Sequence, residues 1–141
     1  MTNSSALSGA VPAIGRILIS AIFPISVSGK LAAPAATVGF IASAQLPLPQ
    51  GAYAIAVFVE LFGGVALALG FHTRIAAAGL AVFCIAAAFG SHSNFGDQNQ
   101  LFHFLKNVAM AGGLLQVVAF GAGRLSLAAR RTRRSQELAV A

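Results

Sequence analysis

Glu60 is the one charged residue in the apolar stretch 52–70, and it lies near the middle of that stretch. As a helix, the stretch spans about 28 Å, which is close to the thickness of the hydrocarbon core of a bilayer. A charged glutamate that faces lipid at this depth is energetically costly. We therefore expect the Glu60 side chain to turn toward a partner or toward water, or to remain protonated.

The candidate partners of Glu60 lie near the ends of the other apolar stretches. Lys30 follows the first stretch, His92 follows the third, and Lys106 and Asn107 lie near the start of the fourth. If the stretches pack side by side as helices, these residues meet in a charged pocket that opens to the outer face, and helical bundles commonly hold their sites between helices. The candidate catalytic residues are Glu60, Lys106 and His92, and the candidate substrate-binding residues are Lys30 and Asn107.

Each of these residues also has a structural interpretation. A lysine at the end of a membrane helix, such as Lys30, commonly extends its ammonium group to the lipid headgroups. An ion pair between Glu60 and Lys106 would fix the packing of two helices without any catalytic role. His92 would then be a solvated loop residue, and Asn107 would hydrogen-bond a neighbouring helix.

Metal and cofactor motifs are weak in this sequence. Cys84, His92, Asp97 and His103 are residue types that bind metals, but their spacing matches no metal-site pattern. The single cysteine allows no internal disulfide and no cysteine cluster, and neither a CxxCH nor a GxGxxG motif is present. We therefore expect no metal and no covalently bound cofactor, and we expect any electron transfer to use a bound quinone or a partner protein.

Composition identifies the class of protein. The 141 residues are 57% hydrophobic and 9% charged, whereas soluble domains carry about 25% charged residues. The chain is therefore expected to be an integral membrane protein. Its net charge of +6 does not indicate nucleic-acid binding, because the positive charge gathers in the tail, where such clusters contact anionic lipid headgroups. The tail arginines are Arg124, Arg130, Arg131, Arg133 and Arg134.

The apolar stretches predict an all-α transmembrane four-helix bundle. Pro34, Pro47 and Pro49 interrupt the region between the first two spans, which predicts a short interfacial or re-entrant helix near 34–44. A cleaved signal peptide is the alternative for the first stretch, but Arg16 is the only basic residue before its apolar core. The predicted segments are a disordered tail 1–10, a membrane domain 11–127 with spans 11–29, 52–70, 75–90 and 104–120, and a basic cytoplasmic tail 128–141.

The distribution of basic residues predicts the orientation. Four spans place both termini on one side of the membrane, and that side carries Arg16, Arg74 and the five tail arginines. The opposite side carries Lys30 and Lys106. Because cytoplasmic segments are enriched in Lys and Arg, both termini are expected in the cytoplasm of a bacterial cell, with Arg16 and Arg74 as anchors at the inner face.

Several short motifs recur in order along the chain: Arg16, SGKL (28–31), GF (39–40), LP (46–47), ELFGG (60–64), LGFHTR (69–74), His92, FLKN (104–107), GGLL (112–115) and GAGRLSL (121–127). This ordered set resembles the DoxX family of small four-helix bacterial inner-membrane proteins. The resemblance covers about residues 14–127, and Pro24 and Ala128 depart from the family pattern.

The resemblance implies a membrane component of a redox-linked system that handles quinone, sulfur compounds or oxidative stress. On that interpretation the Lys/Glu/His pocket binds a quinone headgroup or a small anion, and Glu60 balances the charge or relays a proton. A redox partner protein or a homo-oligomer would complete the system. Two alternatives stay open: a non-catalytic scaffold or assembly subunit, and a small-solute carrier, against which the short chain and the lack of a visible inverted repeat count.

Overall fold

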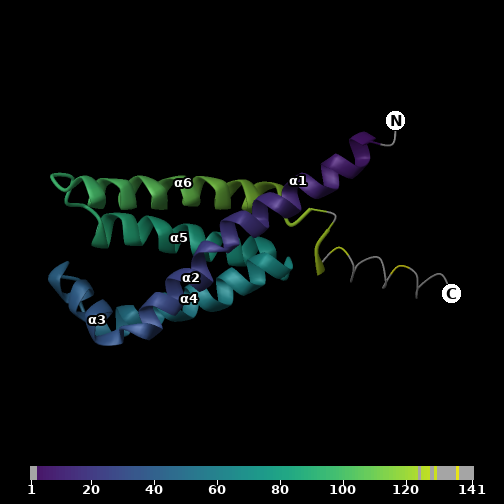
Figure 1. Cartoon of the computed structure of the whole chain (residues 1–141). Coiled ribbons are helices and arrows are strands. Elements are labelled where there is room, and N and C mark those ends of the chain that lie inside the picture. Colours follow the sequence, from purple (N-terminus) through teal and green to yellow (C-terminus); the bar gives the residue numbers. More distant parts are fainter. Residues whose placement is uncertain (1–2, 124, 128, 130–135, 137–141) are drawn as a thin grey trace.

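A computed structural model describes residues 3–123, 125–127, 129 and 136. This part of the chain forms six helices and contains no strand (Figure 1), which confirms the expected all-α fold. In chain order the helices are α1 Asn3–Ser20, α2 Ile22–Ala32, α3 Pro34–Ser43, α4 Pro49–Leu69, α5 Thr73–Ser91 and α6 Gln98–Phe120.

Four helical segments are long and apolar enough to cross a membrane, as the sequence predicts. The first joins the end of α1 to α2, and the other three are α4, α5 and α6. The segments are Gly9–Ala32, Pro49–Leu69, Thr73–Ser91 and Gln98–Phe120. The shorter helix α3 occupies the region between the first two, where the interfacial or re-entrant helix is expected.

The sequence predicts a tail at each end of the chain. Helix α1 begins at Asn3, whereas a disordered tail is expected over 1–10. Once a helix has formed, each added residue gains one backbone hydrogen bond, so α1 extends beyond the span at its N-terminal end, through good helix formers such as Ala6 and Leu7. Most of the expected basic tail, at 128, 130–135 and 137–141, lies outside the described residues.

Prolines separate the four helices of the N-terminal half of the chain. Pro24 has no N–H to offer the carbonyl of Ser20, and the first span is interrupted at Ala21, between α1 and α2. Pro34 begins α3 in the first helical turn, where a missing N–H costs nothing. Pro49 begins α4 in the same way.

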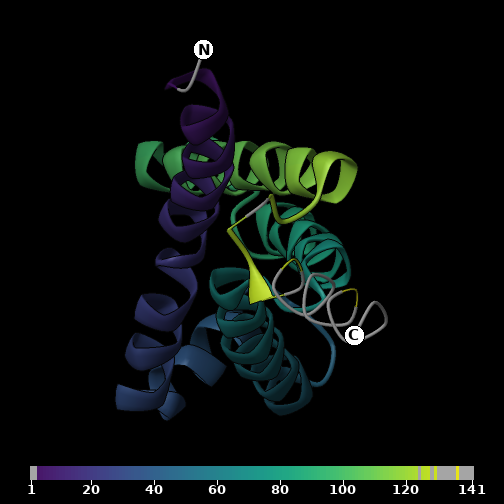
Figure 2. The same cartoon turned by 90° about the vertical axis from the view of Figure 1, so that its right-hand side faces the viewer.

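Two tight connections fold the remaining helices against one another. Gly70 adopts a left-handed conformation at the end of α4, and the N–H of Phe71 donates to the carbonyl of Ala66 (2.9 Å), which closes the helix end. Asp97 begins α6 by accepting hydrogen bonds from the backbone N–H groups of Asn99 and Gln100. Helices α5 and α6 therefore lie side by side as a hairpin, whereas α2 packs against α4 on the other side of the molecule (Figures 1 and 2).

The core is small, and it depends on close helix contacts. Phe23, Leu67, Leu80, Cys84 and Leu114 are its fully buried side chains. Many other large apolar side chains are exposed on the isolated chain, as expected for a surface that faces lipid. Helices α2 and α4 approach closely at Gly64, where an added Cβ atom would lie 2.8 Å from the Cβ atom of Phe23.

Replacing Gly64 with alanine is expected to destabilise the protein by about 1–3 kcal/mol, because the added methyl group forces α2 away from α4. Gly112→Ala is the matched control. It has open space around its Cβ position, so it is expected to be neutral or to stabilise α6 by up to about 1 kcal/mol. Denaturant unfolding in detergent, followed by circular dichroism, measures both. Equal effects of the two substitutions would contradict this account of the α2–α4 contact.

Candidate functional site

A cavity of about 660 Å³ lies among α2, α3, α4, α5 and α6. The five candidate residues from the sequence analysis all line it, although they come from separate segments of the chain. The remaining walls are mainly apolar and include Phe23, Phe83 and Met110. The cavity-lining candidates are Lys30, Glu60, His92, Lys106 and Asn107.

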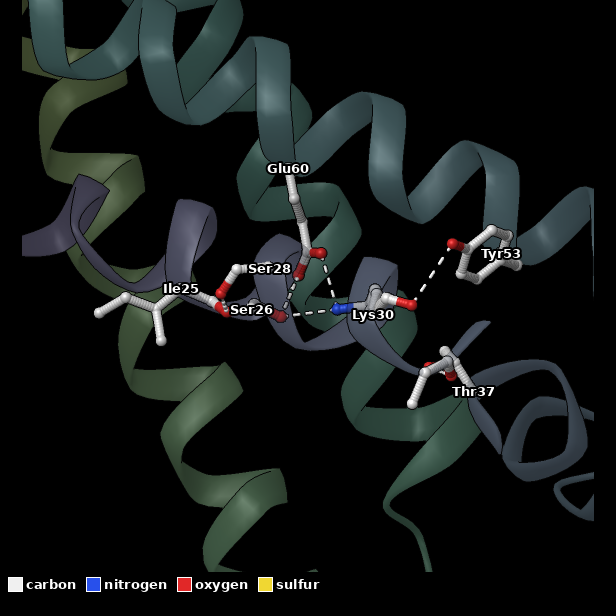
Figure 3. Close-up of polar contacts among 8 residues, drawn as sticks. Ile25, Ser26, Ser28, Lys30, Thr37, Tyr53 and Glu60 are labelled. Carbon is white, nitrogen blue, oxygen red and sulfur yellow. Dashed lines mark hydrogen bonds and ion pairs between the residues drawn. The ribbon is translucent and has the colours of Figure 1, made fainter. Parts of the chain in front are cut away.

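Glu60 is held in a three-residue cluster on one wall of this cavity. Its Oε2 atom lies 2.7 Å from the Nζ atom of Lys30, and its Oε1 atom accepts a hydrogen bond from the Ser26 hydroxyl at 3.0 Å (Figure 3). The Lys30 ammonium also donates to the Ser26 Oγ atom at 2.6 Å. The Glu60 side chain is 6% exposed and that of Lys30 is 20% exposed. Both carboxylate oxygens therefore have a hydrogen-bond donor.

Helix geometry explains how α2 supplies both partners of Glu60. Ser26 and Lys30 are four residues apart, so they lie on the same face of α2. Lys30 is in the last turn of α2, where the helix dipole favours a positive charge. The Tyr53 hydroxyl on α4 lies 3.4 Å from the Lys30 carbonyl oxygen (Figure 3). Helices α2 and α4 are thus joined twice: by the contacts of the Ser26 and Lys30 side chains with Glu60, and by the contact of Tyr53 with the backbone at the end of α2.

The second polar cluster comes from the end of α5 and the start of α6. The rings of His92 and His103 are stacked, with centroids 5.0 Å apart and an interplanar angle of 21°. The Nδ1 atom of His92 lies 2.7 Å from the Gln100 side-chain oxygen. The Nζ atom of Lys106 lies 3.0 Å from Nδ1 of His103. Both histidines and Lys106 line the cavity.

Asn107 hydrogen-bonds within its own helix. It is buried, and its side-chain Nδ2 donates to the carbonyl oxygen of His103 in the same helix at 2.9 Å. This hydrogen bond uses one of the two amide protons. Asn107 therefore supports the position of the histidine turn while also lining the cavity.

The structure distinguishes between the two lysines that were candidates to pair with Glu60. Lys30 makes the ion pair, and Lys106 contacts His103 instead. Among the described residues that line the cavity, Lys30 and Glu60 cancel in charge, which leaves Lys106 as the uncompensated cation. Within the described residues, no group of three or more His, Cys, Asp or Glu side chains is arranged to hold a metal ion.

Sequence reasoning missed three members of these clusters. Ser26 lies in an apolar stretch and Gln100 in a polar segment, and neither is distinguished there by its residue type. His103 has a residue type that binds metals and also suits an interfacial side chain, and neither interpretation places it beside His92 and Lys106. The useful signals were the spacings of Ser26 to Lys30 and of His103 to Lys106, which place each pair on one helix face.

A separate polar cluster lies at the opposite end of the bundle. Arg16 is 4% exposed, and its guanidinium donates to the carbonyl oxygens of Ala122 and Leu125, the latter at 3.0 Å. Arg74 is exposed, and its Nη2 atom lies 3.4 Å from the Ala119 carbonyl oxygen. Both arginines contact the end of α6 or the segment after it, so their role here exceeds that of the simple membrane anchors expected from the sequence.

The chain is similar to known membrane proteins over most of its length. The family model described as DoxX matches residues 11–93. The inner membrane protein YqjF of Escherichia coli (strain K12) is 32% identical over 117 residues, which cover 81% of this chain and 86% of that protein. The inner membrane protein YphA of the same organism is 33% identical over 119 residues, which cover 81% of this chain and 85% of that protein. No solved structure matches the chain.

These similarities agree with the four membrane-length helices. Together they place the chain in the inner membrane as a multi-pass protein, as the sequence predicts. The cytoplasmic position of the termini stays a prediction from the distribution of arginines.

Proposed function

The chain belongs to the DoxX family, and from this premise we propose that its cavity binds the headgroup of a membrane quinone within a redox-linked system. The observation that supports the proposal is the cavity of about 660 Å³, which is lined by polar side chains from both the α2–α4 side and the α5–α6 side of the bundle and otherwise mainly by apolar residues. Ligand sites commonly have volumes of about 300–1,000 Å³ and combine apolar walls with a few polar groups.

The chemistry of a quinone fits these walls. Its ring and its isoprenoid chain are apolar and suit the side chains of Phe23, Phe83 and Met110. Its two carbonyl oxygens are hydrogen-bond acceptors, and the cavity contains the donors Lys106 and His103. When bound, the quinone would supply the redox chemistry, and the residues of this chain would bind and orient it.

The proposal extends to partners. The electrons would come from a redox partner protein that binds either a single copy of this chain or a homo-oligomer of it. The basic residues after α6 would hold that end of the chain against anionic lipid headgroups. The chain itself would thus be the membrane component of the system.

Quinone that co-purifies with the protein tests the proposal. Wild-type protein, extracted in mild detergent, is expected to retain quinone that organic extraction and mass spectrometry can quantify per protein. Ala86→Phe adds a ring to the cavity wall and is expected to remove most of this quinone. Val82→Phe is the matched control, because Val82 is one turn away on α5, exposed and outside the cavity lining.

The other outcomes separate the alternatives. Absence of quinone from the wild-type protein would overturn the proposal. If, in addition, all three proteins retained the same protein partner, the scaffold function would be supported. Uptake of an anion into proteoliposomes without any electron donor would instead support a carrier.

A further inference from the structure

We propose that His92 and His103, rather than Glu60, form the hydrogen-bonding end of this site, with His103 donating to the quinone and His92 accepting from the quinol. This inference rests on the proposed function. It assigns a role to His103 and names which ring serves which redox form of the ligand.

Both carboxylate oxygens of Glu60 already accept hydrogen bonds from side chains of α2. One carboxylate oxygen accepts from the Lys30 ammonium at 2.7 Å, and the other accepts from the Ser26 hydroxyl at 3.0 Å. A proton placed on this carboxyl group would leave the ammonium of Lys30 without its counter-ion in a largely apolar place. Glu60 is therefore poorly suited to change its hydrogen bonds when the ligand changes between quinone and quinol.

The hydrogen bonds of His92 and His103 assign a different tautomer to each ring. The side-chain oxygen of Gln100 can only accept, so the Nδ1 atom of His92 carries its proton. The ammonium of Lys106 can only donate, so the Nδ1 atom of His103 accepts and the proton of this neutral ring is on Nε2. The stacked pair thus has one Nε2–H donor, on His103, and one Nε2 lone pair, on His92.

The two histidine rings complement both redox forms of a quinone. A quinone carbonyl oxygen accepts hydrogen bonds, which matches Nε2–H of His103. A quinol hydroxyl donates hydrogen bonds, which matches the lone pair on Nε2 of His92. Both rings line the cavity, and the Phe40 ring on α3 covers His92 with its centroid 5.9 Å away. The pair is therefore a hydrogen-bonding site within an apolar surround.

Binding of decylubiquinone and of its dithionite-reduced quinol to nanodisc-embedded protein tests the inference. Phenylalanine keeps the ring stacking but removes the ring nitrogens. His103→Phe is expected to weaken quinone binding about tenfold and quinol binding much less. His92→Phe is expected to do the reverse. His72→Asn lies outside the cavity lining and is expected to change neither affinity.

A spectroscopic measurement separates a binding role from a packing role. The chain has three histidines, so nitrogen-15 histidine labelling gives a small set of resolvable ring signals. His92 is expected in the Nδ1–H tautomer and His103 in the Nε2–H tautomer, and the ligand is expected to shift their Nε2 signals but not those of His72.

The outcomes are distinguishable. If the wild-type protein binds neither form of the ligand, both the proposed function and this inference fail. If it binds them but the phenylalanine variants bind equally well, or the tautomers are the reverse, the inference alone is overturned.

Discussion

Replacing Glu60 with glutamine is expected to lower the free energy of unfolding by about 3 kcal/mol. The substitution leaves the Lys30 ammonium, which is 20% exposed, without the carboxylate 2.7 Å away. Removing one partner from a buried ion pair commonly costs about 3–5 kcal/mol, and the remaining exposure of Lys30 favours the lower end of that range. Lys30→Met is expected to have a similar effect, because it leaves the Glu60 carboxylate buried and without its counter-ion.

A double-mutant cycle checks this coupling. The combined variant Lys30→Met/Glu60→Gln contains no orphaned charge at this site, so it is expected to recover most of the stability lost in each single variant. Denaturant unfolding in one detergent gives the four values of the cycle. Lys106→Met is the control, since Lys106 is exposed and contacts a neutral ring, and it is expected to change stability by less than about 1 kcal/mol. Additive losses in the double variant would show that the two charges do not stabilise each other.

The recovered double variant also bears on function. If the Lys30–Glu60 pair serves to join α2 to α4, the double variant should keep its quinone. The histidine variants should lose ligand affinity without losing stability. The pair and the histidines would then have separate tasks in one cavity.

The burial of Glu60 was predictable because a carboxylate in the middle of a membrane-length apolar stretch has few alternatives. The four spans were predictable because the length of an apolar stretch is a strong signal. The lysine that pairs with Glu60 was not predictable. Lys30 and Lys106 both have long flexible side chains near the same end of the bundle, and only the position of α2 against α4, which Gly64 and Phe23 set, decides between them.

Ser26 illustrates a second limit of the sequence. Serines in apolar helices usually bond to the backbone of the preceding turn, as Ser20, Ser28 and Ser43 do here. Ser26 instead bonds across to α4, and nothing in its local sequence distinguishes it from the others. The stacking of His92 on His103 was also not predictable from the local sequence, because it depends on the conformation of the loop between α5 and α6.

The contacts of Arg16 were beyond sequence reasoning for another reason. Its partners are the backbone carbonyls of Ala122 and Leu125, and every residue has a backbone carbonyl, so the residue type does not identify them. A close contact at Gly70 lies beside these hydrogen bonds. A Cβ atom at Gly70 would lie 2.6 Å from the Cβ atom of Ser126 and 3.1 Å from Nη1 of Arg16. The segment after α6 is therefore held against the ends of α1 and α4.

Replacing Arg16 with leucine is accordingly expected to destabilise the protein by about 1–3 kcal/mol, because the carbonyl oxygens of Ala122 and Leu125 lose the charged donor that the buried Arg16 supplies. Arg16→Lys is expected to recover only part of this, since an ammonium cannot bridge two separated acceptors as the guanidinium does. Arg74→Leu is the control: Arg74 is exposed and makes one long contact at 3.4 Å, so a change below about 1 kcal/mol is expected.

A local measurement distinguishes loss of this contact from general destabilisation. The Ala129 N–H donates to the Ser126 hydroxyl, which is buried beside Gly70. If Arg16 holds this segment in place, hydrogen exchange at Ala129 should accelerate in Arg16→Leu under conditions where the amides in the middle of α4 remain protected. Equal acceleration at both places would mean that Arg16 supports the whole bundle, and unchanged exchange at Ala129 would mean that the segment stays docked without it.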